Sequence, residues 1–149
     1  MKNLAIRGGL IGVVLAGGLI LRPFLTGNAG DLAVGECFDP PAATVQEVED
    51  VQHRPCTEAH GGEVFYVGGF PDGENVDYPS DAAWEAHVTA TCVPAFNTYT
   101  GLDYMTDPDW DFGYFVPTAD GWEGGDHEVL CYAIRIDEEP TSVSIKAGG

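Results

Sequence analysis

Four cysteines constrain the fold of this chain more than any other feature of its sequence. They are Cys37, Cys56, Cys92 and Cys131, and an even number of cysteines in a small exported domain predicts a framework of two disulfides. Three pairings are possible, and the sequence does not distinguish them. We favour Cys37–Cys56 with Cys92–Cys131, because this pairing keeps each bridge within one half of the domain. On the chain-entropy model each bridge would stabilise the fold by about 3–4 kcal/mol.

The disulfide interpretation requires export, and the N-terminal segment provides the argument for it. Lys2 and Arg7 precede "GGLIGVVLAGGLIL", an uncharged run over residues 8–21. As a helix this run would be roughly 21 Å long, shorter than the ~30 Å hydrocarbon core, which suits a cleaved signal peptide. The weak cleavage site and the ability of the basic side chains to snorkel favour instead an uncleaved, single-pass membrane anchor over residues 1–25. Both alternatives place residues 30–149 outside the cytoplasm, at the cell membrane or secreted.

The rest of the chain is strongly acidic. The net charge of the whole chain is −18, the 24 acids begin at Asp31, and only Arg54, Arg135 and Lys146 oppose them after that point. Nucleic acid is excluded as a partner, because phosphate binding requires clustered Lys and Arg side chains. The acidic surface would either confer solubility, which we favour, or attract a basic partner.

The hydropathy pattern predicts one α+β domain over residues 32–146, with a polar linker over 26–31 before it. A mostly antiparallel sheet is expected, because short apolar or alternating segments are separated by turn residues. Residues 127–136 are apolar on both faces, which is typical of a central strand covered on both sides. The other expected strands are at 32–38, 48–56, 62–70, 114–116 and, as an edge strand, 141–146.

One principal helix is expected at about 81–100, packed on this sheet. Ser80 can cap its first turn, and Gly101 can stop it. Pro94 lacks an N–H group and is expected to kink or split the helix. Apolar side chains recur every four residues and therefore share one face. They are Trp84, Val88, Cys92 and Phe96.

The stretch "RPCTEAHGGEV" raises the question of a catalytic or metal site, because Cys56, His60 and Glu63 lie close together in it. A cysteine nucleophile needs a base and a stabilised thiolate, and the neighbouring acids disfavour the thiolate. Zinc would need further ligands. We therefore favour a disulfide at Cys56 followed by a turn that His60 shapes, with His60 kept as a speculative binding residue.

Two other groups of residues are candidate binding sites. Asp107, Asp109 and Asp111 alternate as calcium ligands do, but the glycine and glutamate that complete an EF-hand loop are missing. A solvated acidic loop is therefore favoured over calcium. Trp110 and Trp122 are expected in loops, where an exposed ring could recognise a carbohydrate.

The stretches "LAVGECFDPP", "RPCTEAHGGEV", "CVPAFNTYTG" and "GWEGGDHEVLCYAI" occur in this order along the chain. Together they resemble the septum-formation domain, a family of envelope domains found behind an N-terminal membrane segment in high-GC Gram-positive bacteria. The resemblance covers about residues 32–136. It includes the family patterns G-[DE]-C-[FL] at 35–38, P-C-x-x-x-H-x-x-E-V at 55–64 and W-x-x-G-[DE]-x-x-V-x-C at 122–131. It implies a module that faces the envelope and is linked to septum formation, and it implies no catalytic residue.

These observations lead to one expected function and two alternatives. We expect a non-enzymatic, membrane-anchored binding or scaffold domain of the cell envelope that acts in septum formation and needs no cofactor. Its partner is expected to be an envelope or membrane protein. The first alternative is an accessory subunit of a membrane protein complex, which docks through its acidic surface. The second is a cell-wall hydrolase, which requires a free cysteine with a histidine in reach.

Overall fold

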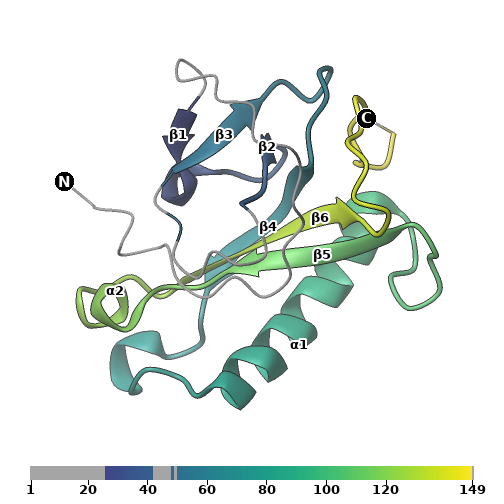
Figure 1. Cartoon of the computed structure of the whole chain (residues 1–149). Coiled ribbons are helices and arrows are strands. Elements are labelled where there is room, and N and C mark those ends of the chain that lie inside the picture. The colour runs from purple at the N-terminus through teal and green to yellow at the C-terminus, as the bar shows by residue number, and fades with distance from the viewer. Residues whose placement is uncertain (1–25, 42–47, 49, 149) are drawn as a thin grey trace.

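The computed structural model describes residues 26–41, 48 and 50–148. It shows an α+β fold in which a six-stranded antiparallel sheet carries one long helix, α1, on one face (Figure 1). This confirms the predicted fold class. The strands, in the order in which they lie in the sheet, are β1 (Thr26–Asn28), β3 (Asp50–Arg54), β2 (Cys37–Asp39), β4 (Gly62–Gly69), β6 (Glu128–Arg135) and β5 (Trp110–Phe115).

The N-terminal segment predicted as a membrane anchor, residues 1–25, lies outside the described residues. Within the part of the chain that the structure does describe, no helix combines the length and the apolar character needed to cross a bilayer.

Helix α1 spans Asp81–Thr100, as predicted. The Ser80 hydroxyl accepts a hydrogen bond from the Ala83 backbone N–H at its start, and Gly101 ends it in the left-handed conformation with φ 75°. The helix is not split at Pro94. Its buried face continues on both sides of the proline, so packing against the sheet holds the helix together where one backbone hydrogen bond is missing.

Strand β6 is the centre of the fold, because it pairs with β4 on one side and β5 on the other. Its side chains alternate between two apolar cores. Leu130, Tyr132 and Ile134 enter one core together with Phe38 of β2. The opposite face, which α1 covers, receives Val129, Cys131 and Ala133. The alternation predicted from the sequence is therefore confirmed.

The disulfides connect these layers. Cys37 at the start of β2 is bonded to Cys56, in the turn before β4, and Cys92 of α1 is bonded to Cys131 of β6. This is the pairing that we favoured from the sequence. The second bridge lies within the core and joins the helix to the central strand, since both of its residues are fully buried.

Several segments differ from the sequence-based expectation. The strand expected at 32–38 is confined to β2, and the strand expected at 114–116 begins already at Trp110, which we expected in a loop. Residues 26–31, predicted as a linker, form β1 and a short 3-10 helix at Ala29–Asp31, because the backbone of β1 pairs with β3. Residues 141–146 do not form an edge strand, and Thr141 makes an isolated bridge to His60 instead. A short helix that we did not predict, α2, spans Ala119–Glu123 and is capped by the Thr118 side chain.

Candidate functional site

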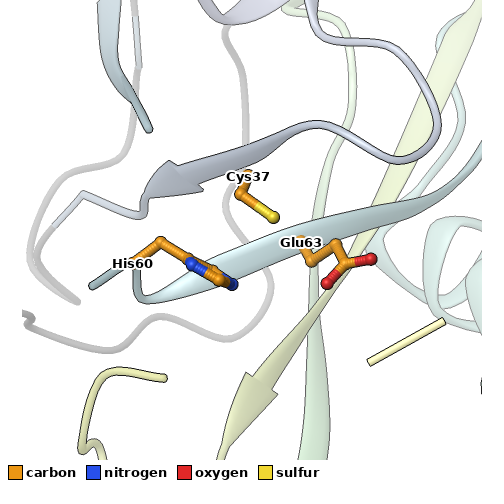
Figure 2. A group of neighbouring side chains, drawn as sticks. All are labelled: Cys37, His60 and Glu63. Atoms are coloured by element: carbon orange, nitrogen blue, oxygen red, sulfur yellow. The ribbon is translucent and has the colours of Figure 1, made fainter. Parts of the chain in front are cut away.

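His60 and Glu63 lie beside Cys37 at the start of β4, and Figure 2 shows the three side chains together. His60 is buried, with 1% of its surface exposed. Its Nδ1 lies 2.8 Å from the Glu58 carbonyl oxygen, and its Nε2 has no hydrogen-bond partner among the described residues. His60 also exchanges two backbone hydrogen bonds with Thr141. The histidine therefore holds the C-terminal segment against the turn before β4.

Glu63 has a similar connecting role. Its Oε1 accepts hydrogen bonds from the Tyr99 hydroxyl and the Ser144 hydroxyl, each at 2.6 Å. Its Oε2 accepts from the Ile145 backbone N–H at 2.8 Å. Burial raises the pKa of Tyr99, and the hydrogen bond to Glu63 and its negative charge raise that pKa further. The carboxylate thus ties β4 both to α1 and to the C-terminal segment.

Cys37, His60 and Glu63 are the group of described residues whose potential metal ligands all lie within 4.8 Å of one another. Zinc binds cysteine as a thiolate, and Cys37 is committed to a disulfide. Both oxygens of Glu63 already accept hydrogen bonds. In this oxidised state the donor set does not fit a metal centre, and the contacts are those of a structural motif.

No described cysteine is free, and all four cysteines lie in the described part of the chain. Cys56 is the residue that the hydrolase alternative required as its nucleophile, and its sulfur is bonded to Cys37. That alternative therefore lacks the thiol on which it was built.

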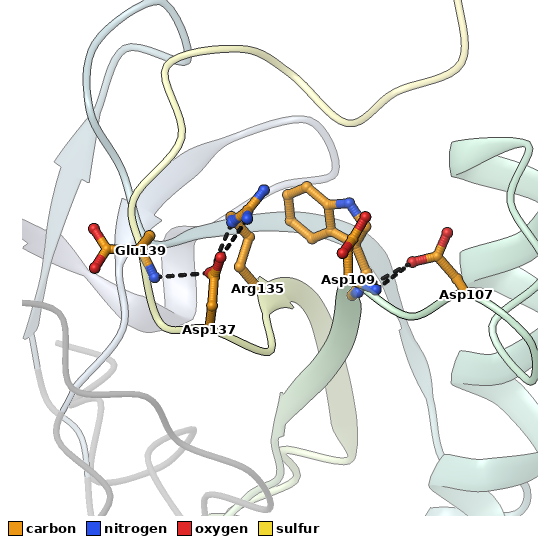
Figure 3. A network of polar contacts seen from close by, with 6 residues as sticks. Asp107, Asp109, Arg135, Asp137 and Glu139 are labelled. Carbon is orange, nitrogen blue, oxygen red and sulfur yellow. Dashed lines mark hydrogen bonds and ion pairs between the residues drawn. The ribbon is translucent and has the colours of Figure 1, made fainter.

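The three aspartates considered for calcium make separate local contacts, and Figure 3 shows Asp107 and Asp109. Asp107 accepts hydrogen bonds from the backbone N–H groups of Asp109 and Trp110. Asp111 accepts from the Tyr104 hydroxyl at 2.7 Å. In the described structure their carboxylates do not form a group within 4.8 Å of one another. The alternating pattern shapes a turn at the start of β5, so the weak calcium prediction has no geometric support.

Figure 3 also shows the ion pair between Arg135 and Asp137, near the end of β6. The hydrogen bond from the Arg135 guanidinium lowers the pKa of Asp137 to about 2. The same guanidinium carbon lies 5.9 Å from the centre of the Trp110 ring. Trp110 is half-buried, and its ring is in contact with a cation of this chain.

The prediction that Trp122 lies exposed in a loop is wrong. Trp122 belongs to α2 and only 5% of its surface is exposed. Its Nε1–H donates a hydrogen bond to the Val76 carbonyl oxygen at 3.0 Å. The ring packs edge-to-face against Tyr78 and Trp84, and this aromatic contact with the loop before α1 explains its burial.

A pocket lies beside Trp122, between α2 and the 3-10 helix η4 (Gly73–Asn75). Its volume is about 440 Å³, within the range of roughly 300–1,000 Å³ that is usual for small-molecule sites. Aromatic rings and carboxylates line it together. The lining residues are Gly73, Glu74, Val76, Asp77, Tyr78, Ala119, Trp122, Glu123, Gly125 and His127.

The aromatic walls of this pocket are held in place by contacts outside it. The Tyr78 hydroxyl donates a hydrogen bond to the Pro117 carbonyl oxygen at 2.8 Å. The His127 ring lies 4.4 Å from the Trp122 ring, centre to centre. Gly73 allows the close approach of His127, because a Cβ atom at this position would come within 2.7 Å of the imidazole. These contacts fix the orientation of the rings that line the pocket.

Apart from Trp122, sequence reasoning missed this site. Its residues come from "PDGENVDYPSD" after β4 and from "ADGWEGGDH" before β6, two segments that we read as loops. Each contains several acids and one tyrosine or tryptophan. Because β4 and β6 are antiparallel neighbours, the last residues of β4 lie beside the first residues of β6. The segments that follow β4 and precede β6 therefore meet at the same end of the sheet. That pairing, combined with the shared composition, is the signal that could have located the pocket.

Comparisons with known proteins identify the family. Residues 34–147 match the family model described as septum formation. Comparison with curated proteins and with solved structures gives no match. The matched region contains both disulfides, the His60–Glu63 motif and the pocket. Since the match covers most of the sequence, the chain belongs to the septum-formation family.

Proposed function

We propose that this chain is a non-enzymatic binding domain that acts outside the cytoplasm in septum formation, held at the membrane by its N-terminal segment. The pocket between η4 and α2 is its binding site. The family match supports a role in cell division, and the two disulfides are consistent with a location outside the cytoplasm.

The observation that carries this proposal is the pocket with its fixed aromatic walls. Preorganised aromatic surface is characteristic of recognition, because little conformational entropy is lost on binding. The carboxylates of Glu74, Asp77 and Glu123 are exposed at its rim. Catalytic acids are more often desolvated, since burial is how a protein adjusts a carboxyl group for proton transfer. The arrangement favours binding over catalysis.

The second candidate is an accessory subunit of a membrane protein complex. It is favoured by the charge of −18, which would attract a basic partner. Docking of this kind would weaken strongly as salt is raised. Docking through the wider acidic surface would spread the contact over many carboxylates. A partner bound at the pocket would instead contact the residues that line it.

Site-specific photocross-linking tests this proposal in living cells of the host. A photoreactive amino acid replaces Val76, which lies at the pocket and is 43% exposed, or Met105, which lies in the loop after α1 and is 76% exposed. We expect a discrete cross-linked partner from position 76, enriched in dividing cells, and none from position 105. Identical adducts at both positions, or no adduct at position 76, would overturn the proposal. Deletion of the gene should also delay or misplace septa.

A further inference from the structure

We propose that the pocket between η4 and α2 binds a primary ammonium group carried on an alkyl chain, as in the side chain of a lysine in a peptide partner. The carboxylates of Glu74, Asp77 and Glu123 receive the charge, and the rings of Tyr78 and Trp122 contact the alkyl chain. This inference rests on the proposed binding function and names the chemistry of its ligand.

The charge of the pocket is the first argument. Three carboxylates line it, and no lysine or arginine does. Both arginines of the described residues are paired with carboxylates elsewhere: Arg54 with Asp39, and Arg135 with Asp137. The pocket therefore has no arginine or lysine of its own to neutralise it. A ligand that brings a positive charge is attracted both by the rim and by the net charge of the whole domain.

The aromatic lining is the second, independent argument. Tyr78 and Trp122 meet edge-to-face, with ring centres 6.0 Å apart and planes at 88°. Tyr78 is half-buried and offers the larger apolar surface to an alkyl chain, whereas Trp122 contributes the 5% of its surface that is exposed. The negative faces of aromatic rings also attract ammonium groups. Both rings are fixed by hydrogen bonds to backbone carbonyls. An anionic ligand would be repelled by these carboxylates.

The geometry favours an organic cation over a metal ion. Glu74, Asp77 and Glu123 do not form one of the groups, within the described part of the chain, that bring three ligand atoms within 4.8 Å of one another. A bare divalent cation needs its oxygen ligands at about 2.0–2.6 Å. The pocket volume of about 440 Å³ suits a chain of several carbon atoms. A primary ammonium with three N–H donors can also be shared by separate carboxylates.

The test is an NMR titration of the full chain with both disulfides intact. The probe is Nα-acetyl-lysine methylamide, and the readout is the shift of the Trp122 indole N–H. Two control probes are the neutral norleucine analogue, which has the same alkyl chain without the charge, and the trimethylated lysine analogue, which has the charge without N–H donors. We expect saturable shifts with the lysine probe, at least tenfold weaker binding of the trimethyl form, and no saturation with norleucine.

Two triple variants test whether the carboxylates of the pocket, rather than the net charge of the domain, bind the lysine probe. The triple variant Glu74→Gln, Asp77→Asn, Glu123→Gln should weaken lysine binding at least tenfold. The matched control Asp109→Asn, Glu138→Gln, Glu139→Gln removes the same charge from exposed positions, and should change binding less than twofold. Equal weakening by both triples would show that only the overall field attracts the probe, and would overturn the proposal. So would equal binding of the norleucine analogue or tighter binding of the trimethyl form.

The two proposals fail in different ways. If position 76 captures a partner but the lysine probe does not bind, the ammonium inference is wrong and the binding function stands. If the probe binds at Trp122 and position 76 captures nothing in dividing cells, the pocket chemistry stands and the proposed function is wrong.

Discussion

Replacement of Glu63 by glutamine tests how the C-terminal segment is held to the sheet. The wild-type carboxylate accepts hydrogen bonds from Tyr99 and Ser144 at Oε1 and from the Ile145 backbone N–H at Oε2. Glutamine keeps one oxygen, which can accept from the two hydroxyl groups. Its NH₂ group then faces the Ile145 N–H, so that two donors meet at a buried position where one acceptor is required.

The magnitude follows from these three contacts. A hydrogen bond to a charged group contributes about 1.5–3 kcal/mol, against about 0.5–1.5 kcal/mol for a neutral one. Glu63→Gln loses one charged hydrogen bond and converts two others to neutral ones. Since neighbouring contributions are not additive, we expect the free energy of unfolding to fall by about 3 kcal/mol rather than by the full sum. Tyr99→Phe removes one contact and should cost about 2 kcal/mol.

Urea denaturation and hydrogen exchange provide the two measurements. The midpoint of unfolding should fall for Glu63→Gln, and exchange of the Ile145 amide should become faster under native conditions. Glu139→Gln, at an exposed carboxylate, is the control and should leave both unchanged. Combined with Tyr99→Phe, the glutamine variant should lose less than the sum of the two single losses, because the contact is shared. A loss below about 0.5 kcal/mol, as expected of an ordinary surface substitution, with unchanged Ile145 exchange would refute the reasoning.

Two further predictions concern the disulfides and the ionisable groups. Under native conditions a water-soluble phosphine should open the Cys37–Cys56 bridge before the core bridge, because Cys56 is partly exposed; alkylation and peptide mapping would show the order, and equal rates would contradict it. Burial, the hydrogen bond to Asp111 and its charge raise the pKa of Tyr104 from 10.0 to about 12. A raised pKa in the folded state means that this group's stabilising contribution is complete below pH 10 and is lost as the pH rises towards 12. Carbon-13 NMR of labelled tyrosine should report the pH titration of the Tyr104 hydroxyl. Asp111→Asn should lower the pKa of Tyr104 only partly, since the burial of Tyr104 remains.

The elements that could be predicted from the sequence are those specified by neighbouring residues. Ser80 and Gly101 define the two ends of α1 through contacts within a few residues, so a short window of sequence contains the whole signal. The two apolar faces of β6 are similarly visible in a run of eight residues. Pro94 is the instructive exception, because the local rule predicts a break that packing against the sheet prevents.

The pocket could not be predicted by the same reasoning, because its residues are brought together by pairing over long distances in the chain. Trp122 is buried by the loop that contains Val76 and Tyr78, and its hydrogen bond to Val76 spans 46 residues. Its own surroundings, "ADGWEGGD", contain mostly glycine and acids and resemble an exposed loop. The residue pattern of a short segment predicts its exposure only when the segment packs against residues that are close to it in the sequence.

The stretch from Cys56 to Glu63 shows why a set of residues that resembles a catalytic site can be structural. Its three candidate residues all contact other segments: Cys56 is bonded to β2, His60 pairs with Thr141 of the C-terminal segment, and Glu63 binds both Tyr99 of α1 and that same segment. All of these contacts lie at the start of β4, whereas the pocket lies beyond its far end, roughly 23 Å away along an extended strand of this length. The family motif thus holds one end of the sheet together, and the pocket lies at the opposite end. A cysteine, a histidine and a glutamate at such short spacing therefore indicate chemistry only if their polar atoms remain available, and here the disulfide and the hydrogen bonds engage all but the Nε2 atom of His60.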